Sequence, residues 1–141
     1  MGRLSTSGSR KNPVYPGGCR AATRSVQRVL NHWKQHPNRN YGIATGKPSG
    51  IFVLDIDGPE GEASLRSLCA KNGLLLPTVT VLTAKGRHLY FDTNGLLIGN
   101  SVGKLGPGID VRGDGGYVVG AGSVHPSGHV YHYANEQEIG Q

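Results

Sequence analysis

Glycine-rich turns divide most of this chain into short segments, and this pattern constrains the fold more than any other feature. The 141 residues include 23 glycines, well above the usual share. Many of them lie in turn-like groups at 46–50 (GKPSG), 106–108 (GPG), 113–116 (GDGG) and 125–128 (HPSG). The runs between these groups are short and rich in β-branched and aromatic residues, which favours strands. Short turns join neighbouring antiparallel strands, so we expect a mostly antiparallel sheet.

Two helices are expected ahead of most of these strands. The first is predicted to begin at Thr23, a good N-cap, and to end before Pro37, with apolar residues at helical spacing between them. The second is predicted from Pro59 to Gly73, with acidic residues favourable in its first turn. The predicted fold class is therefore α+β. The expected strands cover residues 41–45, 51–56, 78–83, 87–92, 108–113, 117–123 and 130–134.

Positive charge is concentrated at the start of the chain. The formal net charge is +6, and Asp55 is the first acidic residue in the sequence. A basic surface of this kind suits a polyanion such as nucleic acid or a nucleotide, and a merely soluble basic surface is the alternative. We expect residues 1–12 to form a flexible basic segment and residues 13–141 to form one domain. The lysines and arginines before Asp55 are Arg3, Arg10, Lys11, Arg20, Arg24, Arg28, Lys34, Arg39 and Lys47.

The sequence carries no sign of membrane insertion or export. No apolar run approaches the roughly 20 residues of a membrane-spanning helix, and the N-terminus has no signal-peptide pattern. The two cysteines, Cys19 and Cys69, lie far apart and form no CxxC motif, which is typical of reduced thiols. We therefore expect a cytoplasmic protein without a membrane partner.

The most apolar run of the chain ends in two carboxylates. Its apolar residues, in 53–58 (VLDIDG), predict a buried strand. Strand side chains alternate between faces, so Asp55 and Asp57 should project from the same face. Two like charges held together favour a cation between them, and carboxylate oxygens suit Mg²⁺. A solvated strand end is the alternative interpretation of this pair.

A third carboxylate lies on another predicted strand. Asp110 sits between Ile109 and Val111 in the segment 108–113 (GIDVRG), so it should point away from the apolar side of that strand. Three acids on adjacent strands resemble a two-metal site, in which one ion activates an attacking oxygen and the other stabilises a leaving oxygen.

Basic side chains accompany these acids. His88 should share a strand face with Tyr90, and it is either a packing residue or a hydrogen-bond donor to a phosphate oxygen. Lys85, Arg87 and Arg112 add positive charge, and arginine can bind a phosphate through two parallel hydrogen bonds.

Two polar residues, Ser123 and His125, lie where a predicted strand ends. Such a position suits a ligand contact, and simple turn chemistry is the alternative. Other site chemistries have less support, because no cysteine is spaced for a structural zinc site and no nucleophile triad is apparent.

Four segments in order resemble the motifs of the bifunctional primase–polymerase N-terminal domain, of the archaeo-eukaryotic primase superfamily. The resemblance runs from about Trp33 to Tyr131, and the order and spacing of the segments make it specific. They are 42–46 (GIATG), 53–58 (VLDIDG), 86–91 (GRHLYF) and 105–128 (LGPGIDVRGDGGYVVGAGSVHPSG).

This resemblance implies a primase-like fold, in which helices flank a mostly antiparallel, RRM-like sheet. It makes residues 13–141 a catalytic domain that is short at both ends, and thus a trimmed domain, a fragment or a minimal stand-alone form. It also implies that Asp55, Asp57 and Asp110 are catalytic and hold two Mg²⁺ or Mn²⁺ ions. The residues expected to bind the nucleotide are His88, at the triphosphate, together with Lys85, Arg87, Arg112, Ser123 and His125.

The function implied is that of a template-dependent nucleotidyltransferase, a DNA primase or DNA polymerase. Its expected partners are a single-stranded DNA template, ribo- or deoxyribonucleoside triphosphates, and a replicative helicase in cis or in trans. Two alternatives stay open. One is a nucleotide- or single-strand-binding module without turnover, and the other is a metal-dependent nuclease.

Overall fold

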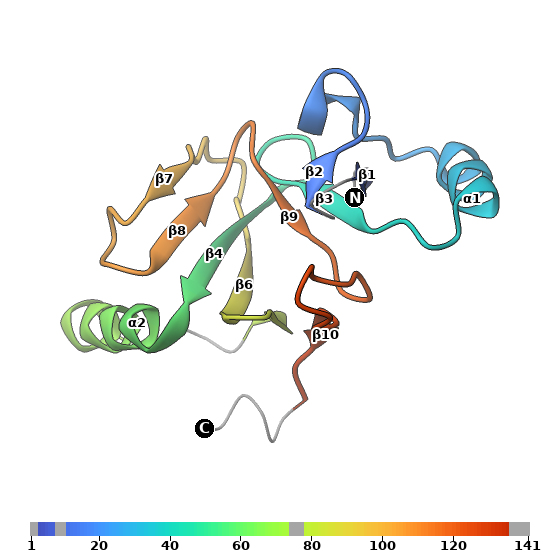
Figure 1. Cartoon of the computed structure of the whole chain (residues 1–141). Helices are drawn as coiled ribbons and strands as arrows, with labels where there is room; N and C mark the ends of the chain where they lie inside the picture. The colour runs from blue at the N-terminus through green and yellow to red at the C-terminus, as the bar shows by residue number, and fades with distance from the viewer. Residues whose placement is uncertain (1–2, 8–10, 74–77, 136–141) are drawn as a thin grey trace.

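The computed structural model describes residues 3–7, 11–73 and 78–135 of the chain (Figure 1). The α-helices in this part of the chain are α1 (Val26–Gln35) and α2 (Gly58–Asn72), and a short 3-10 helix, η1 (Gly18–Ala21), precedes α1. The strands are β1 (Arg3–Ser7), β2 (Asn12–Pro13), β3 (Tyr41–Ala44), β4 (Ile51–Asp57), β5 (Thr80–Leu82), β6 (Gly86–Asp92), β7 (Ser101–Val102), β8 (Ile109–Arg112), β9 (Tyr117–Val119) and β10 (His132–Tyr133).

The larger sheet has six strands in the order β10-β5-β6-β4-β8-β7, and every neighbouring pair is antiparallel. Strand β4 lies between β6 and β8, and α2 lies beside this sheet (Figure 1). Leu54 and Ile56 of β4 are buried in one cluster with Leu65 of α2, Leu89 of β6 and Ile109 of β8. One face of the sheet is therefore the apolar core under α2.

The smaller sheet, in the order β2-β1-β3-β9, lies against the other face of β4. Val53 of β4 packs there with Ile43 of β3 and Val118 of β9. Val81 of β5 forms a neighbouring cluster with Val119 of β9. These contacts cover one end of the face, and the acidic end of β4 is left for polar side chains.

A tight turn joins β5 to β6 beside the end of β4. The backbone N–H of Gly86 donates to Thr83 Oγ1 (3.0 Å), and Gly86 pairs with Asp57 across the sheet. A Cβ atom at Gly86 would collide with the carbonyl oxygen of Ile56. Glycine at this position therefore lets the turn approach the end of β4 closely.

The α+β class and the antiparallel sheet are confirmed, and the first helix begins later than expected. Its N-cap is Ser25, whose Oγ accepts from the N–H of Arg28 (3.4 Å). Thr23, the predicted cap, instead accepts from the N–H of Ser25 (3.1 Å) and so stabilises the turn before the helix. Two hydroxyls in the same sequence can both cap, and the turn geometry decides between them.

Two further features were not expected from the sequence. Val26 and Leu30 of α1 are 70% and 60% exposed, although their helical spacing predicted a buried stripe. Strand β1 lies within the segment predicted to be flexible, and it pairs with β3. Its partner is far away in sequence, so no local pattern marks it. The predicted domain boundary after residue 12 stays a prediction.

Candidate active site

The strand register brings three predicted site residues into one row. Asp55 of β4 lies directly opposite His88 of β6 on one side and Asp110 of β8 on the other. Residues opposite each other in an antiparallel pair share a face of the sheet. Leu54 and Ile56, which alternate with Asp55, point into the core under α2. The apolar residues of β4 thus anchor the strand, and the acid projects from its other face.

Asp57 completes the acidic end of β4. It is the last residue of the strand and the N-cap position of α2, but its side chain makes no capping hydrogen bond with the described residues. Asp57 is exposed, whereas Asp55 is partly buried. The two carboxylates therefore share a face, as alternation predicted, and meet different environments.

Positively charged groups lie among the acids. Arg112 Nη2 is 2.9 Å from Asp110 Oδ2 and 3.8 Å from Asp55 Oδ2. His88 Nε2 is 3.4 Å from Asp55 Oδ1, and the N–H of Gly103 donates to Asp110 Oδ1 (3.2 Å). Arg112 therefore bridges the two carboxylates of the row and offsets their repulsion.

These neighbours keep Asp55 ionised. Burial is the largest single influence and raises the pKa of the Asp55 carboxyl. The hydrogen bond and charge of His88, with the charges of Arg112 and Lys11, together bring that pKa below its ordinary value. The partly buried carboxylate is thus negative at neutral pH and available to bind a cation.

Two pockets open over Asp55 and His88 of this row. The larger has a volume of about 400 Å³ and extends toward Tyr117 and Gly116, and the smaller, of about 170 Å³, includes Asp57, Lys85 and His125. Both are lined by Lys11, Asp55, His88, Arg112 and Tyr131. Asp55 and Asp57 thus lie in a basic and aromatic depression, whereas Asp110, next to Asp55 in the row, is not among the described residues that line either pocket.

The sequence matches the family described as bifunctional DNA primase/polymerase, N-terminal, over residues 4–141. The chain belongs to this Prim-Pol family. Membership implies a DNA primase/polymerase-type nucleotidyltransferase acting on DNA and nucleotides. The α+β arrangement with two α-helices in the described residues agrees with a Prim-Pol domain. A comparison with curated proteins found no match.

The Prim-Pol fold gathers most, but not all, of the residues predicted to bind nucleotide. Lys85 and His125 line the smaller pocket beside Asp57. Arg87 lies on the opposite face of β6, where its Nε is 2.8 Å from Glu62 Oε1 of α2. The structure therefore does not bring Arg87 to the acids.

Ser123 is also outside the pocket. It is only 2% exposed, and its Oγ accepts from the N–H of Tyr41 (3.1 Å) and lies 3.3 Å from the carbonyl oxygen of the same residue. These bonds fasten the segment after β9 to β3. In this arrangement Ser123 has a structural role, which was the alternative interpretation of its position.

Two lining residues were missed at the sequence level. Lys11 reaches both pockets from the segment that was predicted to be flexible. Tyr131 is 3% exposed, and its ring centroid lies 6.1 Å from that of His88 and 6.2 Å from that of His125. Burial, followed by the charges of Asp55 and Asp57, raises the pKa of Tyr131 to about 12. Only its alternation with exposed residues in 130–134 could have marked it.

The acids suit a hard cation by their chemistry, because their donors are all carboxylate oxygens. Among the described residues, however, no three His, Cys, Asp or Glu side chains are grouped closely enough to hold a metal ion. Arg112 occupies the space between Asp55 and Asp110. Arg112 therefore competes with a cation for the oxygens of Asp55 and Asp110.

Within the described ranges, no helix is both long enough and apolar enough to cross a bilayer. The cytoplasmic location stays a prediction.

Proposed function

We propose that this Prim-Pol domain joins nucleotides on a single-stranded DNA template, with Asp55, Asp57 and Asp110 as its catalytic acids. The observation that carries the proposal is the three-strand register, which puts Asp55 between His88 and Asp110, together with the basic pocket that Asp55 and His88 line. Family membership supports the reaction class, and the register supports the choice of Asp55 and Asp110.

The ligands proposed for two Mg²⁺ or Mn²⁺ ions are the three carboxylates. Asp57 is exposed and Asp55 is held ionised, so both can bind a cation without a protonation change. When bound, such ions lower the barrier by activating the attacking 3′-oxygen and stabilising the charge on the phosphate. The structure's own residues contribute by holding these oxygens on one face of a rigid sheet.

Basic side chains around the acids are proposed to bind the triphosphate. Lys11 and Lys85 line the pocket next to Asp57, and lysine is a compact positive charge for phosphate. Arg112 can exchange its carboxylate partners for a phosphate, because a guanidinium binds both anions in the same geometry. His88 is proposed to donate to the triphosphate through Nε2, which here faces Asp55.

A second candidate function is nucleotide or single-strand binding without turnover. The observation that favours it is the bridge that Arg112 makes between Asp55 and Asp110. If this bridge persists when nucleotide binds, the acids cannot gather metal ions and the pocket only binds its ligand.

One experiment separates these functions from each other and from nuclease activity. The chain is incubated with a labelled primer on a longer single-stranded template, deoxynucleoside triphosphates and Mn²⁺. Extension supports the proposal, a mobility shift without product supports the binding module, and degradation indicates a nuclease.

A test variant and its control remove acidic charges at neighbouring exposed positions. Asp57→Asn removes a charge from the exposed end of β4 and should abolish extension. Glu60→Gln removes a charge three residues later, on the exposed first turn of α2, and should leave extension unchanged. Equal activity of Asp57→Asn and the parent would contradict the assignment of Asp57. A helicase partner, in cis or in trans, stays a prediction from the family resemblance.

A further inference from the structure

A separate pocket lies between η1 and α1. Its volume is about 440 Å³, and it shares no lining residue with the two pockets at the acids. The residues that line it include Tyr15, His32 and Trp33, with aromatic rings, and the basic residues Arg20 and Arg28. Among the described residues that line it, none is acidic. This composition, aromatic rings with unopposed positive charge, is that of single-stranded nucleic-acid sites.

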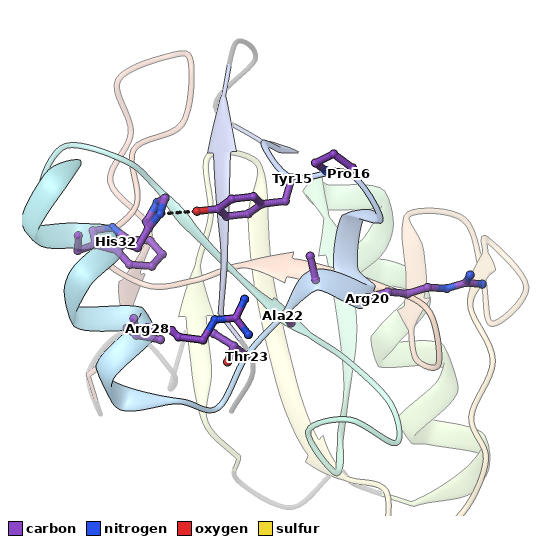
Figure 2. A pocket seen from close by; sticks show the side chains of 10 residues that line it. Tyr15, Pro16, Arg20, Ala22, Thr23, Arg28 and His32 are labelled. Atoms are coloured by element: carbon purple, nitrogen blue, oxygen red, sulfur yellow. Dashed lines mark hydrogen bonds between the residues drawn. The ribbon is translucent and has the colours of Figure 1, made fainter.

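The aromatic wall is held in place before any ligand binds. Tyr15 Oη is 2.6 Å from His32 Nδ1 (Figure 2), and the centroids of the His32 and Trp33 rings are 4.6 Å apart. Trp33 Nε1 donates to the carbonyl oxygen of Arg39 (2.8 Å). Burial, with the charges of Arg39 and His36, lowers the pKa of His32 and keeps its ring neutral. The Tyr15 side of this wall is open, because Tyr15 is 46% exposed.

Two arginines of the lining carry positive charge, and their side chains extend in different directions. Figure 2 shows Arg28 extending from α1 toward Thr23, while Arg20 leaves η1 on the side away from His32 and Tyr15. Both side chains are exposed, and neither forms an ion pair with a carboxylate of the described residues. Unpaired arginines of this kind bind phosphate without first breaking an internal contact.

η1 lies between this pocket and the acid-lined site. Cys19 of η1 donates through Sγ to the carbonyl oxygen of Gly115 (3.1 Å), and Gly115 lines the larger acid-site pocket. Tyr117 of the same pocket donates to the carbonyl oxygen of Lys11 (3.1 Å). η1 therefore contributes Arg20 to the η1–α1 pocket and contacts a residue of the acid-site pocket through Cys19.

We propose that the η1–α1 pocket binds a nucleotide of the single-stranded template outside the acid-lined site. The base packs against Tyr15 and the wall behind it, and the flanking phosphates bind Arg28 and Arg20. This inference rests on the proposed function, because it names where one part of the template strand lies while the acids act on the adjacent part. A peptide or a second copy of the chain on the same pocket is the alternative that the experiment excludes.

Trp33 gives a local readout, because it is the single tryptophan of the chain and lines this pocket. The full chain is titrated, without metal or nucleotide, with an unlabelled oligothymidylate of about 16 nucleotides, the upper end of a typical single-strand site. We expect saturable quenching of Trp33 fluorescence. The anisotropy of a labelled strand should give the same affinity.

Substitutions test the two parts of the pocket. Arg28→Gln should weaken binding about fivefold at 0.1 M salt and reduce the slope of log affinity against log salt by about 0.7, the value for one phosphate contact on a single strand. Lys34→Gln removes an exposed charge from the same helix, outside the pocket, and should leave the slope unchanged. Tyr15→Leu should weaken binding about 5- to 150-fold, the loss expected for one base–aromatic stack. Tyr15→Phe, which keeps the ring, should bind like the parent.

Several results would overturn the inference. Strand binding seen by anisotropy without a change in Trp33 fluorescence would place the strand elsewhere. Equal weakening by Arg28→Gln and Lys34→Gln would show only diffuse charge attraction, and quenching by protein concentration alone would show a second copy in the pocket. The proposed function is tested separately, by primer extension. If the parent extends primers while the pocket variants bind the strand as tightly as the parent does, the pocket inference is wrong and the assignment of the catalytic acids is unaffected.

Discussion

Removing the carboxylate of Asp55 should destabilise the fold, whereas removing that of Asp57 should not. The Asp55 side chain is only 19% exposed and lies 3.4 Å from His88 Nε2 and 3.8 Å from Arg112 Nη2. A hydrogen bond to a charged group typically contributes about 1.5–3 kcal/mol. These two contacts are long, so we expect Asp55→Ala to lower the free energy of unfolding by about 2 kcal/mol. Asp55→Asn, which keeps an acceptor oxygen, should lower it by about 1 kcal/mol.

Asp57→Ala is the matched control for this prediction. Asp57 is exposed and belongs to none of the ion pairs among the described residues, so its loss should change the free energy of unfolding by less than about 0.5 kcal/mol. Urea denaturation at pH 7 with a chelator present measures all three variants without bound metal. From the sequence alone, relief of repulsion between the two acids predicts that both alanine variants are as stable as the parent or more stable.

The pH dependence gives a second test of the same contacts. Because the pKa of Asp55 is lowered in the folded state, its ionised form stabilises the fold above the ordinary value of 3.8. That contribution is lost as the pH falls through the folded pKa. The stability difference between the parent and Asp55→Asn should therefore shrink as the pH is lowered from 7 to about 3. An Asp55→Ala variant more stable than the parent at pH 7 would refute the idea that His88 and Arg112 compensate the buried charge.

Three further predictions concern neighbouring residues. Gly86→Ala should destabilise the fold by about 2–3 kcal/mol in a urea titration, because its Cβ collides with the Ile56 carbonyl oxygen. Arg87→Met breaks the ion pair with Glu62 and should cost up to about 1 kcal/mol, while calorimetry should show unchanged nucleotide affinity; a large loss would place Arg87 in the site. His88→Ala should weaken nucleotide binding roughly 10- to 150-fold and leave Mn²⁺ affinity nearly unchanged, with His88→Asn recovering part of the loss. Equal losses of both affinities would make His88 a metal ligand.

The faces of the strands could be predicted from the sequence because side-chain alternation is a property of the backbone. It placed Asp55 and Asp57 together and put His88 on the opposite face of its strand from Arg87. The structure has the same arrangement. Arg87 was nevertheless expected at the phosphate because of its charge, and alternation proved the better guide to its position.

Contacts between distant segments could not be predicted in the same way. Lys11 lines the pocket with Asp55 from the segment before η1, and Tyr131, far from both in sequence, lies beside His88. In α1, helical spacing put the apolar residues Val26 and Leu30 on one side of the helix. It could not show that both side chains stay exposed among the described residues. Local patterns give the face of an element, and tertiary packing decides what meets it.

The acids of β4 and β8 show why a carboxylate pattern alone is ambiguous. Arg112 lies two residues after Asp110, so the alternation that puts the acids on one face also puts a guanidinium there. A partly buried acid pair needs positive charge whether or not the protein is an enzyme, and Arg112 supplies it here. The same contact competes with a divalent ion for the oxygens of Asp55 and Asp110. The difference between a catalytic domain and a binding module thus depends on the partner that Arg112 takes when nucleotide and metal arrive.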